Sequence, residues 1–200
     1  GSEMCIRDRF PPKTEKGLQN LPGTIDHLMK YNPSYISCTY GAGGGNVGAN
    51  REVCQMIKNA GTTPVTHFTV IKNTKEGIKE QLDQYLADGV DHMLALRGDI
   101  PLGETTTCGD FDYATDLVKF VRDTYGDKFE IAVAGSPEGH ISCRSLESDI
   151  AVLKQKQDNG ADYIMTQLCW DMEQFKYWLD AIRKAGVTMP IDVGIMPILD

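Results

Sequence analysis

The stretch "ADGVDHMLALRGDIP" (residues 87–101) contains, in order, a helix end, a tight turn, a short apolar run and a polar turn. Gly89 stands where helices commonly end in a left-handed residue, a conformation that glycine adopts most easily. The run that follows has the length and apolar character of a buried strand, and it leads directly into Arg97, Gly98 and Asp99. The role of these polar residues therefore depends on the elements that surround the strand end.

The same helix-to-strand turn recurs along the chain. Its four copies are "NAGTTP" (59–64), "ADGVDH" (87–92), "DNGADY" (158–163) and "KAGVTMP" (184–190). The expected strands are 35–40, 63–70, 91–96, 129–135, 162–168 and 190–196. The expected helices are 50–59, 74–88, 114–124, 145–159 and 172–184, with Thr74 and Ser145 as N-caps. Alternating strands and helices at intervals of about 30 residues predict a parallel α/β sheet with crossover helices.

Such a sheet is either an open doubly wound sheet or a (β/α)8 TIM-type barrel. The glycine-rich "GAGGGNVG" (41–48) contains the letters of a dinucleotide fingerprint, but it follows the wrong strand and has the wrong spacing to a helix start. We interpret this segment as a loop at the mouth of a barrel. A barrel places its chemistry at the carboxyl ends of the strands.

Composition restricts the class of protein. The chain has 200 residues, 41% of them hydrophobic, and a net charge of -8, which argues against a nucleic-acid or membrane-surface partner and favours a small molecule. No apolar run approaches the roughly 20 residues of a membrane span. The six cysteines show no metal or disulfide spacing, and we expect reduced, buried thiols in a cytoplasmic protein. We expect one domain over 1–200, with Gly1 and Ser2 left by cloning and 3–9 as an atypical first strand.

Polar residues follow several of the expected strands. They are Thr39, Tyr40, His67, Arg97, Gly98, Asp99, Ser136, Glu138, His140 and Gln167. Taken alone, Asp99 is as often a turn former as a ligand group, but Gly98 and Arg97 beside it favour a polar ligand. His67 in a strand is more often a core residue, whereas His140 in a loop is either solvated or ligand-facing. Gln167 can both donate and accept hydrogen bonds.

Neither a metal site nor an activated nucleophile is visible among these residues. No histidine pair has ligand spacing, and no cysteine or serine stands in an activating context. The strand ends are rich in hydrogen-bonding groups and poor in reactive ones. That combination fits an organic cofactor that supplies the chemistry.

Several motifs together resemble the bacterial catalytic-domain type of the 5,10-methylenetetrahydrofolate reductase family. They are "FPPKTEKG" (10–17), "YISCTYGAGG" (35–44), "THFTV" (66–70), "LALRGDIP" (94–101), "YATDLV" (113–118), "PEGH" (137–140), "NGADYIMTQ" (159–167) and "GIMP" (194–197). The resemblance implies a barrel that holds FAD and reduces methylenetetrahydrofolate to 5-methyltetrahydrofolate with NADH or NADPH. It also implies a role in the one-carbon metabolism that serves methionine biosynthesis, and a homo-oligomeric full-length form.

The resemblance assigns roles by position. Asp99 corresponds to the carboxylate near flavin N1 and the folate ring, and Gln167 to an amide that binds the substrate. Residues at flavin-lining positions are Thr39, Tyr40, Ala42, His67, Arg97, Gly98, Asp99, Ala114, His140, Asp149 and Lys156. Lys156 would suit the diphosphate as a point charge. Asp8 stands where the family has a glutamate that acts as general acid, between Arg7 and Arg9.

Two departures from the family pattern lead to further expectations. An aspartate is one methylene shorter than glutamate, so we expect Asp8 to impair the folate step. Family members also continue beyond a point equivalent to Asp200, so we expect a barrel incomplete at its C-terminal end, without its last strand and helices. Two alternatives stay open: an inactive barrel remnant that keeps at most a flavin or nucleotide site, and a pterin-binding barrel of the methyltransferase type.

Overall fold

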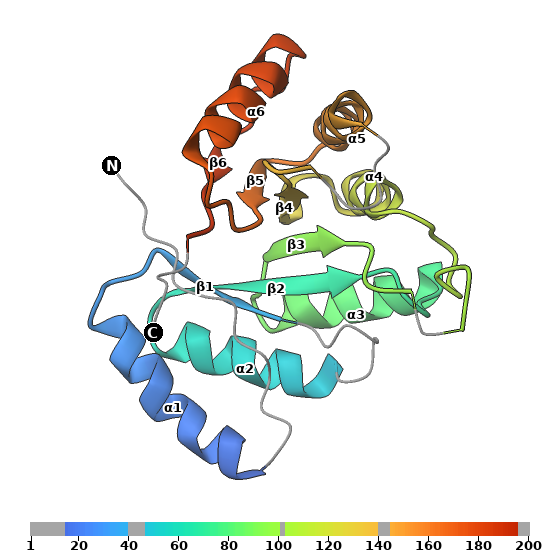
Figure 1. Cartoon of the computed structure of the whole chain (residues 1–200). Helices are drawn as coiled ribbons and strands as arrows, with labels where there is room; N and C mark the ends of the chain where they lie inside the picture. Colours follow the sequence, from blue (N-terminus) through green and yellow to red (C-terminus); the bar gives the residue numbers. More distant parts are fainter. Residues whose placement is uncertain (1–14, 40–46, 101–102, 140–144, 196–200) are drawn as a thin grey trace. The chain divides into compact units, whose positions relative to one another are not determined.

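The computed structural model describes residues 15–39, 47–100, 103–139 and 145–195. These residues form two compact units, an N-terminal unit (Gly1–Tyr113) and a C-terminal unit (Ala114–Asp200). In both units, parallel strands alternate with helices (Figure 1). The predicted α/β class is therefore confirmed.

The N-terminal unit contains three helices and three strands among its described residues. In chain order they are α1 (Glu15–Met29), β1 (Tyr35–Cys38), α2 (Val47–Asn59), β2 (Thr63–Thr69), α3 (Lys75–Ala87) and β3 (His92–Leu96). β1 pairs in parallel with β2, and β2 with β3. The sequence pattern did not predict α1, which contains Pro22 in its interior, and it placed the start of α2 three residues too late.

A buried amide shows which face of this sheet the helices cover. Asn50, on α2, is fully buried and donates to the Cys38 backbone oxygen at 3.2 Å. Its Oδ1 accepts hydrogen bonds from Thr66 Oγ1 on β2 at 2.8 Å and from Tyr85 Oη on α3 at 2.7 Å. The Cys38 sulfur also accepts from the Asn50 amide at 3.3 Å, so the Cys38 and Thr66 side chains face α2 and α3. Because side chains alternate along a strand, the opposite face carries Ser37, Val65, His67 and Thr69.

The C-terminal unit repeats the strand-helix order. Its elements are α4 (Ala114–Tyr125), the short 3-10 helix η1 (Gly126–Lys128), β4 (Glu130–Gly135), α5 (Leu146–Asp158), β5 (Tyr163–Thr166), α6 (Met172–Lys184) and β6 (Ile191–Asp192). β4 pairs in parallel with β5, and β5 with β6. Trp178 on α6 is 1% exposed and packs close to Gly135, where a Cβ atom would lie 3.1 Å from its ring. Glycine at position 135 thus lets α6 approach the end of β4.

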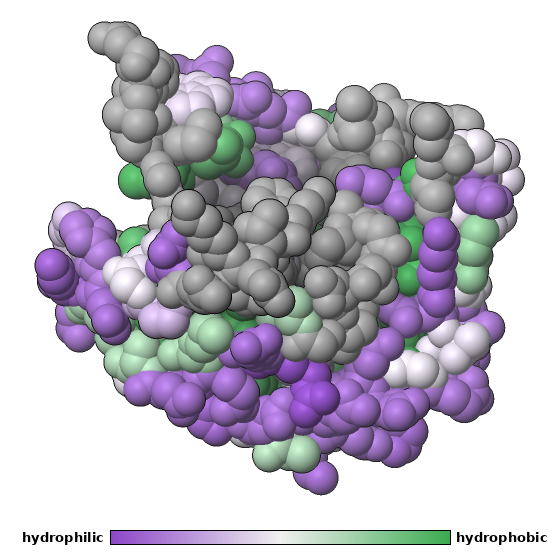
Figure 2. Space-filling view, turned by 90° about the horizontal axis from the view of Figure 1, so that it is seen from below, coloured by the Kyte–Doolittle hydropathy of each residue, from purple (hydrophilic) through white to green (hydrophobic). Residues whose placement is uncertain are grey.

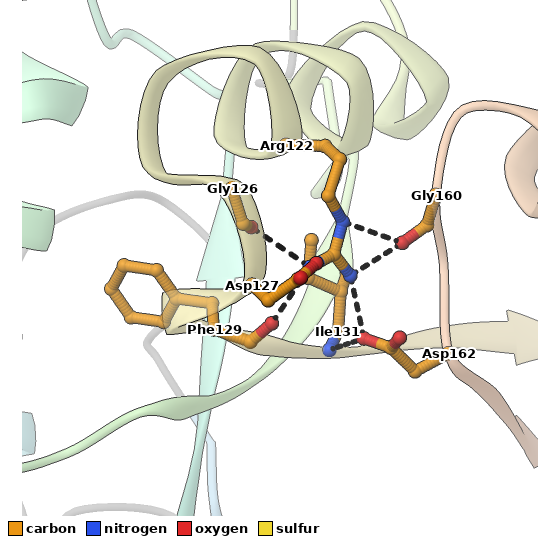
Figure 3. A network of polar contacts seen from close by, with 7 residues as sticks. All are labelled: Arg122, Gly126, Asp127, Phe129, Ile131, Gly160 and Asp162. Carbon is orange, nitrogen blue, oxygen red and sulfur yellow. Dashed lines mark hydrogen bonds and ion pairs between the residues drawn. The ribbon is translucent and has the colours of Figure 1, made fainter.

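Arg122 connects several backbone segments of the C-terminal unit (Figure 3). Its Nε and Nη2 donate to the Gly160 carbonyl at 3.0 and 2.6 Å, and Nη2 also pairs with Asp162 at 2.7 Å. The same Asp162 oxygen accepts the backbone N–H of Ile131 at 2.8 Å. Nη1 donates to the carbonyls of Gly126 and Phe129. One guanidinium therefore ties α4, η1 and β4 to the turn between α5 and β5.

The predicted turns and caps are confirmed. The glycines past the helix ends all have left-handed backbones: Gly61, Gly89, Gly160 and Gly186 have φ values of 97°, 69°, 104° and 84°. Thr74 accepts a hydrogen bond from the Gly77 N–H. Ser145 forms a reciprocal capping box with Ser148. These local signals are readable because each depends on residues close together in sequence.

The cysteine expectation is confirmed only in part. Cys38, Cys54, Cys108 and Cys169 carry no disulfide, and the first two are buried. Cys108 is exposed and Cys169 partly exposed, so the expectation of burial is wrong for both. Both lie outside helices and strands, where chain neighbours do not predict burial. Cys5 and Cys143 lie outside the described residues.

The described surface is mostly hydrophilic in the view of Figure 2, with small and separate hydrophobic patches. Among the described residues, no helix combines the length and the apolar character that crossing a membrane requires.

Candidate functional site

The carboxyl ends of β1, β2 and β3 bring five of the predicted site residues into one region of the N-terminal unit. The strand register pairs Cys38 with Thr66 and Leu96 with Thr69. Thr39 therefore follows β1 at the level of His67, and the turn that begins at Arg97 starts just beyond the end of β2. His67 is 5% exposed, and Thr39 is partly buried. Together with Arg97, Gly98 and Asp99, these residues form what we call the strand-end cluster.

Gly98 has a backbone that other residues adopt only with strain. Its φ is 86°, and a Cβ atom built there would lie 2.6 Å from Ile71 Cγ1 and 3.2 Å from Thr69 Cβ. A side chain at this position would clash with the end of β2. The turn therefore passes against β2 with no space between them, and this close approach requires glycine.

Asp99 and Arg97 have different surroundings although they are neighbours in sequence. Asp99 is exposed, and no described residue forms an ion pair or hydrogen bond with it. Arg97 is partly buried, and its Nε donates to the Gly98 carbonyl at 3.3 Å. The sequence suggested a cation beside the carboxylate, but no ion pair joins the two within the described residues. The Asp99 carboxylate is thus available to a ligand.

The loop that follows Asp99 is fixed to the start of α3. Lys72 N–H donates to the Thr107 carbonyl at 2.8 Å, and Asp110 N–H donates to the Asn73 carbonyl at 3.0 Å. The Asp110 carboxylate in turn accepts the Lys75 N–H at 2.8 Å, at the first turn of α3. These bonds anchor the far end of the segment that carries Asp99.

In the C-terminal unit, Gln167 comes directly after β5. Its backbone N–H donates to the Gly135 carbonyl at 2.8 Å, which fixes the main chain at the end of β4. The side chain is exposed, and no described residue forms a hydrogen bond with its amide. Ala114 is the first residue of α4, where backbone N–H groups lack partners within the helix. Gln167 therefore offers an amide that no described residue uses, and the start of α4 offers backbone N–H groups without a partner inside the helix.

Glu138 holds the segment that follows Gln167. Its carboxylate accepts the Trp170 N–H at 3.2 Å, and the nearby Pro137 carbonyl accepts a hydrogen bond from the Gln174 amide at 3.2 Å. Partial burial raises the pKa of the Cys169 thiol, and a hydrogen bond with the Glu138 carboxylate raises it further. The loop after β4 thus positions the loop after β5.

Two predicted residues lie on α5. Asp149 is in the first turn of this helix and is partly buried. Lys156 lies seven residues further on, close to two helical turns away and hence on the same side. Its Nζ donates to the Ala134 carbonyl of β4 at 3.2 Å. Asp149 and Lys156 therefore place one carboxylate and one ammonium group on one side of α5.

Four predicted site residues, Asp8, Tyr40, Ala42 and His140, lie outside the described residues, as do strand 3–9 and most of the loop 41–48. One buried polar residue next to the strand-end cluster was not singled out in the sequence analysis: Thr69, the last residue of β2. Its position at the end of the alternating "PVTHFT" (64–69) was readable, but whether its hydroxyl has a hydrogen-bond partner was not.

Comparison with known proteins identifies the family. The family model described as methylenetetrahydrofolate reductase matches residues 3–200. The chain belongs to the methylenetetrahydrofolate reductase family. Methylenetetrahydrofolate reductase (NADH) 1 of Arabidopsis thaliana is 39% identical over 94% of this chain and 34% of its own length. 5,10-Methylenetetrahydrofolate reductase of Escherichia coli K12 is 34% identical over 94% of this chain and 62% of its own length. The chain thus spans about a third of the plant reductase and less than two thirds of the bacterial one.

Solved structures support the barrel type of fold. An uncharacterized protein from Clostridium thermocellum, described as binding two copies of 5-methyl-5,6,7,8-tetrahydrofolic acid, matches 96% of this chain and 65% of its own, with a TM-score of 0.68 and 13% identity. A 2,3-dimethylmalate lyase matches 85% of this chain and 61% of its own, with a TM-score of 0.59 and 13% identity. These neighbours are TIM-barrel-like, as the sequence predicted for this reductase-family chain.

Proposed function

We propose that the chain forms the flavin and folate site of a reductase that converts 5,10-methylenetetrahydrofolate to 5-methyltetrahydrofolate, with NADH or NADPH as the hydride donor. The observation that carries the proposal is the Gly98 turn, which presents an exposed Asp99 at the end of β3 in a chain that matches the family over residues 3–200. Closure of the parallel sheet into an eight-stranded barrel, the finer part of the fold prediction, belongs to the same proposal.

The residues of the strand-end cluster fit a flavin. Gly98 lets the backbone approach a flat ring closely, and Asp99 offers a carboxylate that no described residue neutralises. His67 and Arg97 add partly or fully buried donors at the same strand ends. FAD, when bound, supplies the hydride-transfer chemistry that none of these side chains possesses.

Asp99 has two tasks in the proposed reaction. Its negative charge disfavours the accumulation of negative charge on a ring bound beside it, and so it sets the driving force for reduction. As a hydrogen-bond acceptor it also orients a donor group on the folate ring. Gln167 would bind the same substrate through its amide, which no described residue occupies.

The phosphate groups of the cofactor need positive groups. Lys156 supplies one ammonium group, and the N-terminus of α4 at Ala114 supplies backbone N–H groups. We propose these as the diphosphate contacts, with Thr39, Tyr40, Ala42, His140 and Asp149 completing the cofactor site. Asp8 is the proposed general acid toward the folate, with a reach one methylene shorter than the glutamate of the family.

Absorbance spectroscopy of the purified 200-residue chain tests the proposal. We expect a flavin spectrum after incubation with FAD, and bleaching when NADH or NADPH is added without oxygen. Methylenetetrahydrofolate should then restore the absorbance as it is reduced. A chain that neither retains FAD nor is reduced would contradict the proposal.

The variant Asp99→Asn gives a sharper readout than activity alone. Removal of the negative charge should raise the reduction potential of the bound FAD by about 30 mV, which corresponds to about 1.4 kcal/mol for a two-electron couple. Asp112→Asn, which removes an exposed acid of the same unit, is the matched control. Equal potentials for both variants would remove Asp99 from the flavin site.

A further inference from the structure

Thr69 is a buried polar residue at the end of β2 whose hydroxyl has no hydrogen-bond partner among the described residues. The residue is 3% exposed. Buried hydroxyl groups in proteins are nearly always hydrogen-bonded, because loss of contact with water is otherwise not compensated. An exception at the carboxyl end of a parallel strand, where ligands bind, requires an explanation.

Other buried threonines of the same unit follow the rule. Thr66, three residues earlier on β2, donates to Asn50 Oδ1 at 2.8 Å, and Thr107 donates to the Phe111 carbonyl at 2.7 Å. Thr66 faces the helices, whereas Thr69 lies on the opposite face with His67. On β2, the Thr66 hydroxyl on the helix side thus has a partner, whereas the Thr69 hydroxyl on the other side has none among the described residues.

Thr69 also lies beside the turn that carries Asp99. Its Cβ is 3.2 Å from the place where a Cβ of residue 98 would be, so the turn passes directly against it. The hydroxyl therefore lies next to the strand-end cluster and extends it. A hydroxyl can both donate and accept, which suits the edge of a heteroaromatic ring with carbonyl and ring-nitrogen groups.

We propose that the Thr69 hydroxyl is a positioning group that hydrogen-bonds the ring edge of the bound flavin beside Gly98 and Asp99. This inference rests on the proposed function, because it takes FAD as the occupant of the site. In the ligand-free chain the hydroxyl is desolvated without compensation, and binding of FAD supplies the missing partner. The site is thereby preorganised to bind the flavin ring.

The test compares Thr69→Val, Thr69→Ser and Thr66→Val in the full chain, with FAD as the probe. Valine keeps the shape of threonine and removes the hydroxyl. We expect Thr69→Val to bind FAD about tenfold more weakly, as for the loss of one hydrogen bond. Thr69→Ser should restore binding to within about threefold. The visible absorbance maxima of bound FAD should also differ between the wild type and Thr69→Val.

Thermal unfolding of the ligand-free variants separates this role from a structural one. Thr69→Val should have a Tm equal to or above that of the wild type, because it removes a hydroxyl that lacks a partner. Thr66→Val should have a lower Tm, since it leaves Asn50 short of a donor, but should bind FAD with unchanged Kd at temperatures where it is folded. This opposite pair of responses is specific to a ligand-facing Thr69.

Two other outcomes would contradict the inference, and they differ in what they say about the proposed function. A Thr69→Val chain that binds FAD as tightly as the wild type, or that loses as much Tm as Thr66→Val, overturns the inference and leaves the proposed function standing. A wild-type chain that binds no FAD rejects the proposed function and this inference with it.

Discussion

Gly98 shows how one residue without a side chain can shape the candidate site. Its φ of 86° lies in the left-handed region, and the space that a Cβ would need is taken by Ile71 and Thr69. The turn can therefore approach β2 only because residue 98 ends at its Cα. The segment that carries the exposed Asp99 therefore runs close beside Thr69, whose hydroxyl is buried.

Replacement of Gly98 by alanine should destabilise the protein through two effects. The left-handed backbone costs a non-glycine residue about 1 kcal/mol, and the clash with Ile71 should add about 1–2 kcal/mol. Gly103→Ala is the matched control, because Gly103 has a similar φ of 90° but no atom within 4 Å of the added Cβ. Urea denaturation should show a lower midpoint for Gly98→Ala than for Gly103→Ala. Equal midpoints would mean that the turn moves away from β2 without loss.

At the scale of single residues, the sequence predicts which residues lie at the strand ends better than it predicts their hydrogen bonds. The polar residues after the strands were readable as a group, because the periodic pattern fixes where each strand ends. The partners of each group were not readable: the sequence places the cation of Arg97 two residues from the Asp99 carboxylate, yet the Arg97 Nε donates to the Gly98 carbonyl. Hydrogen-bond satisfaction depends on three-dimensional neighbours, so Thr69 could not be found from its letters.

Among the elements, the loops after β4 and β5 behave as one assembly. Glu138 accepts the Trp170 N–H and a hydrogen bond from Cys169, and α6 adds the bond from Gln174 to the Pro137 carbonyl. Gln167 begins the second of these loops. A substitution in the loop after β4 should therefore shift Gln167, although Gln167 itself is not substituted.

Glu138→Gln tests this assembly through the ionisation of the Cys169 thiol. Burial and the Glu138 carboxylate both raise the pKa of Cys169, so the wild-type thiol should ionise at a higher pH than an ordinary thiol. The neutral glutamine removes the second cause, so the midpoint of iodoacetamide alkylation against pH should fall. Peptide mass spectrometry measures it at Cys169. Glu173→Gln, at an exposed position on α6, should leave the midpoint unchanged. An unchanged midpoint in Glu138→Gln would contradict the contact.

The elements themselves were predicted well where a local signal exists. The glycine turns, the Thr74 and Ser145 caps and the apolar strands were all readable. Helix α1 was missed because Pro22, with Gly23 after it, stands inside the helix where both residues are normally unfavourable. Packing overrides propensity there: Leu21, Ile25 and Leu28 are buried. Local sequence rules therefore determine the turns and caps, whereas α1 depends on packing against the rest of the protein.

For the whole molecule, the sequence predicts one domain, in which the two compact units fold together. Each described unit has three parallel strands, and parallel sheets are stable only with both faces covered. The helices α2 and α3 cover one face of β1 and β2. A single domain over the chain, as predicted from the sequence, would make the stability of each unit depend on the other.

Arg122→Met tests this dependence by weakening the C-terminal unit alone. The side chain is 19% exposed and donates to two carbonyls and the Asp162 carboxylate at 3.0 Å or less, so its loss should cost about 2–3 kcal/mol. Lys119→Met on the same helix, whose ion pair with Asp123 is 63% and 62% exposed, should cost less than about 0.5 kcal/mol. Hydrogen exchange reports on each unit separately. We expect faster exchange of the slowest amides in Arg122→Met in both units, because a single cooperative domain opens as a whole. Faster exchange confined to residues 114–195 would show two independently folding units instead.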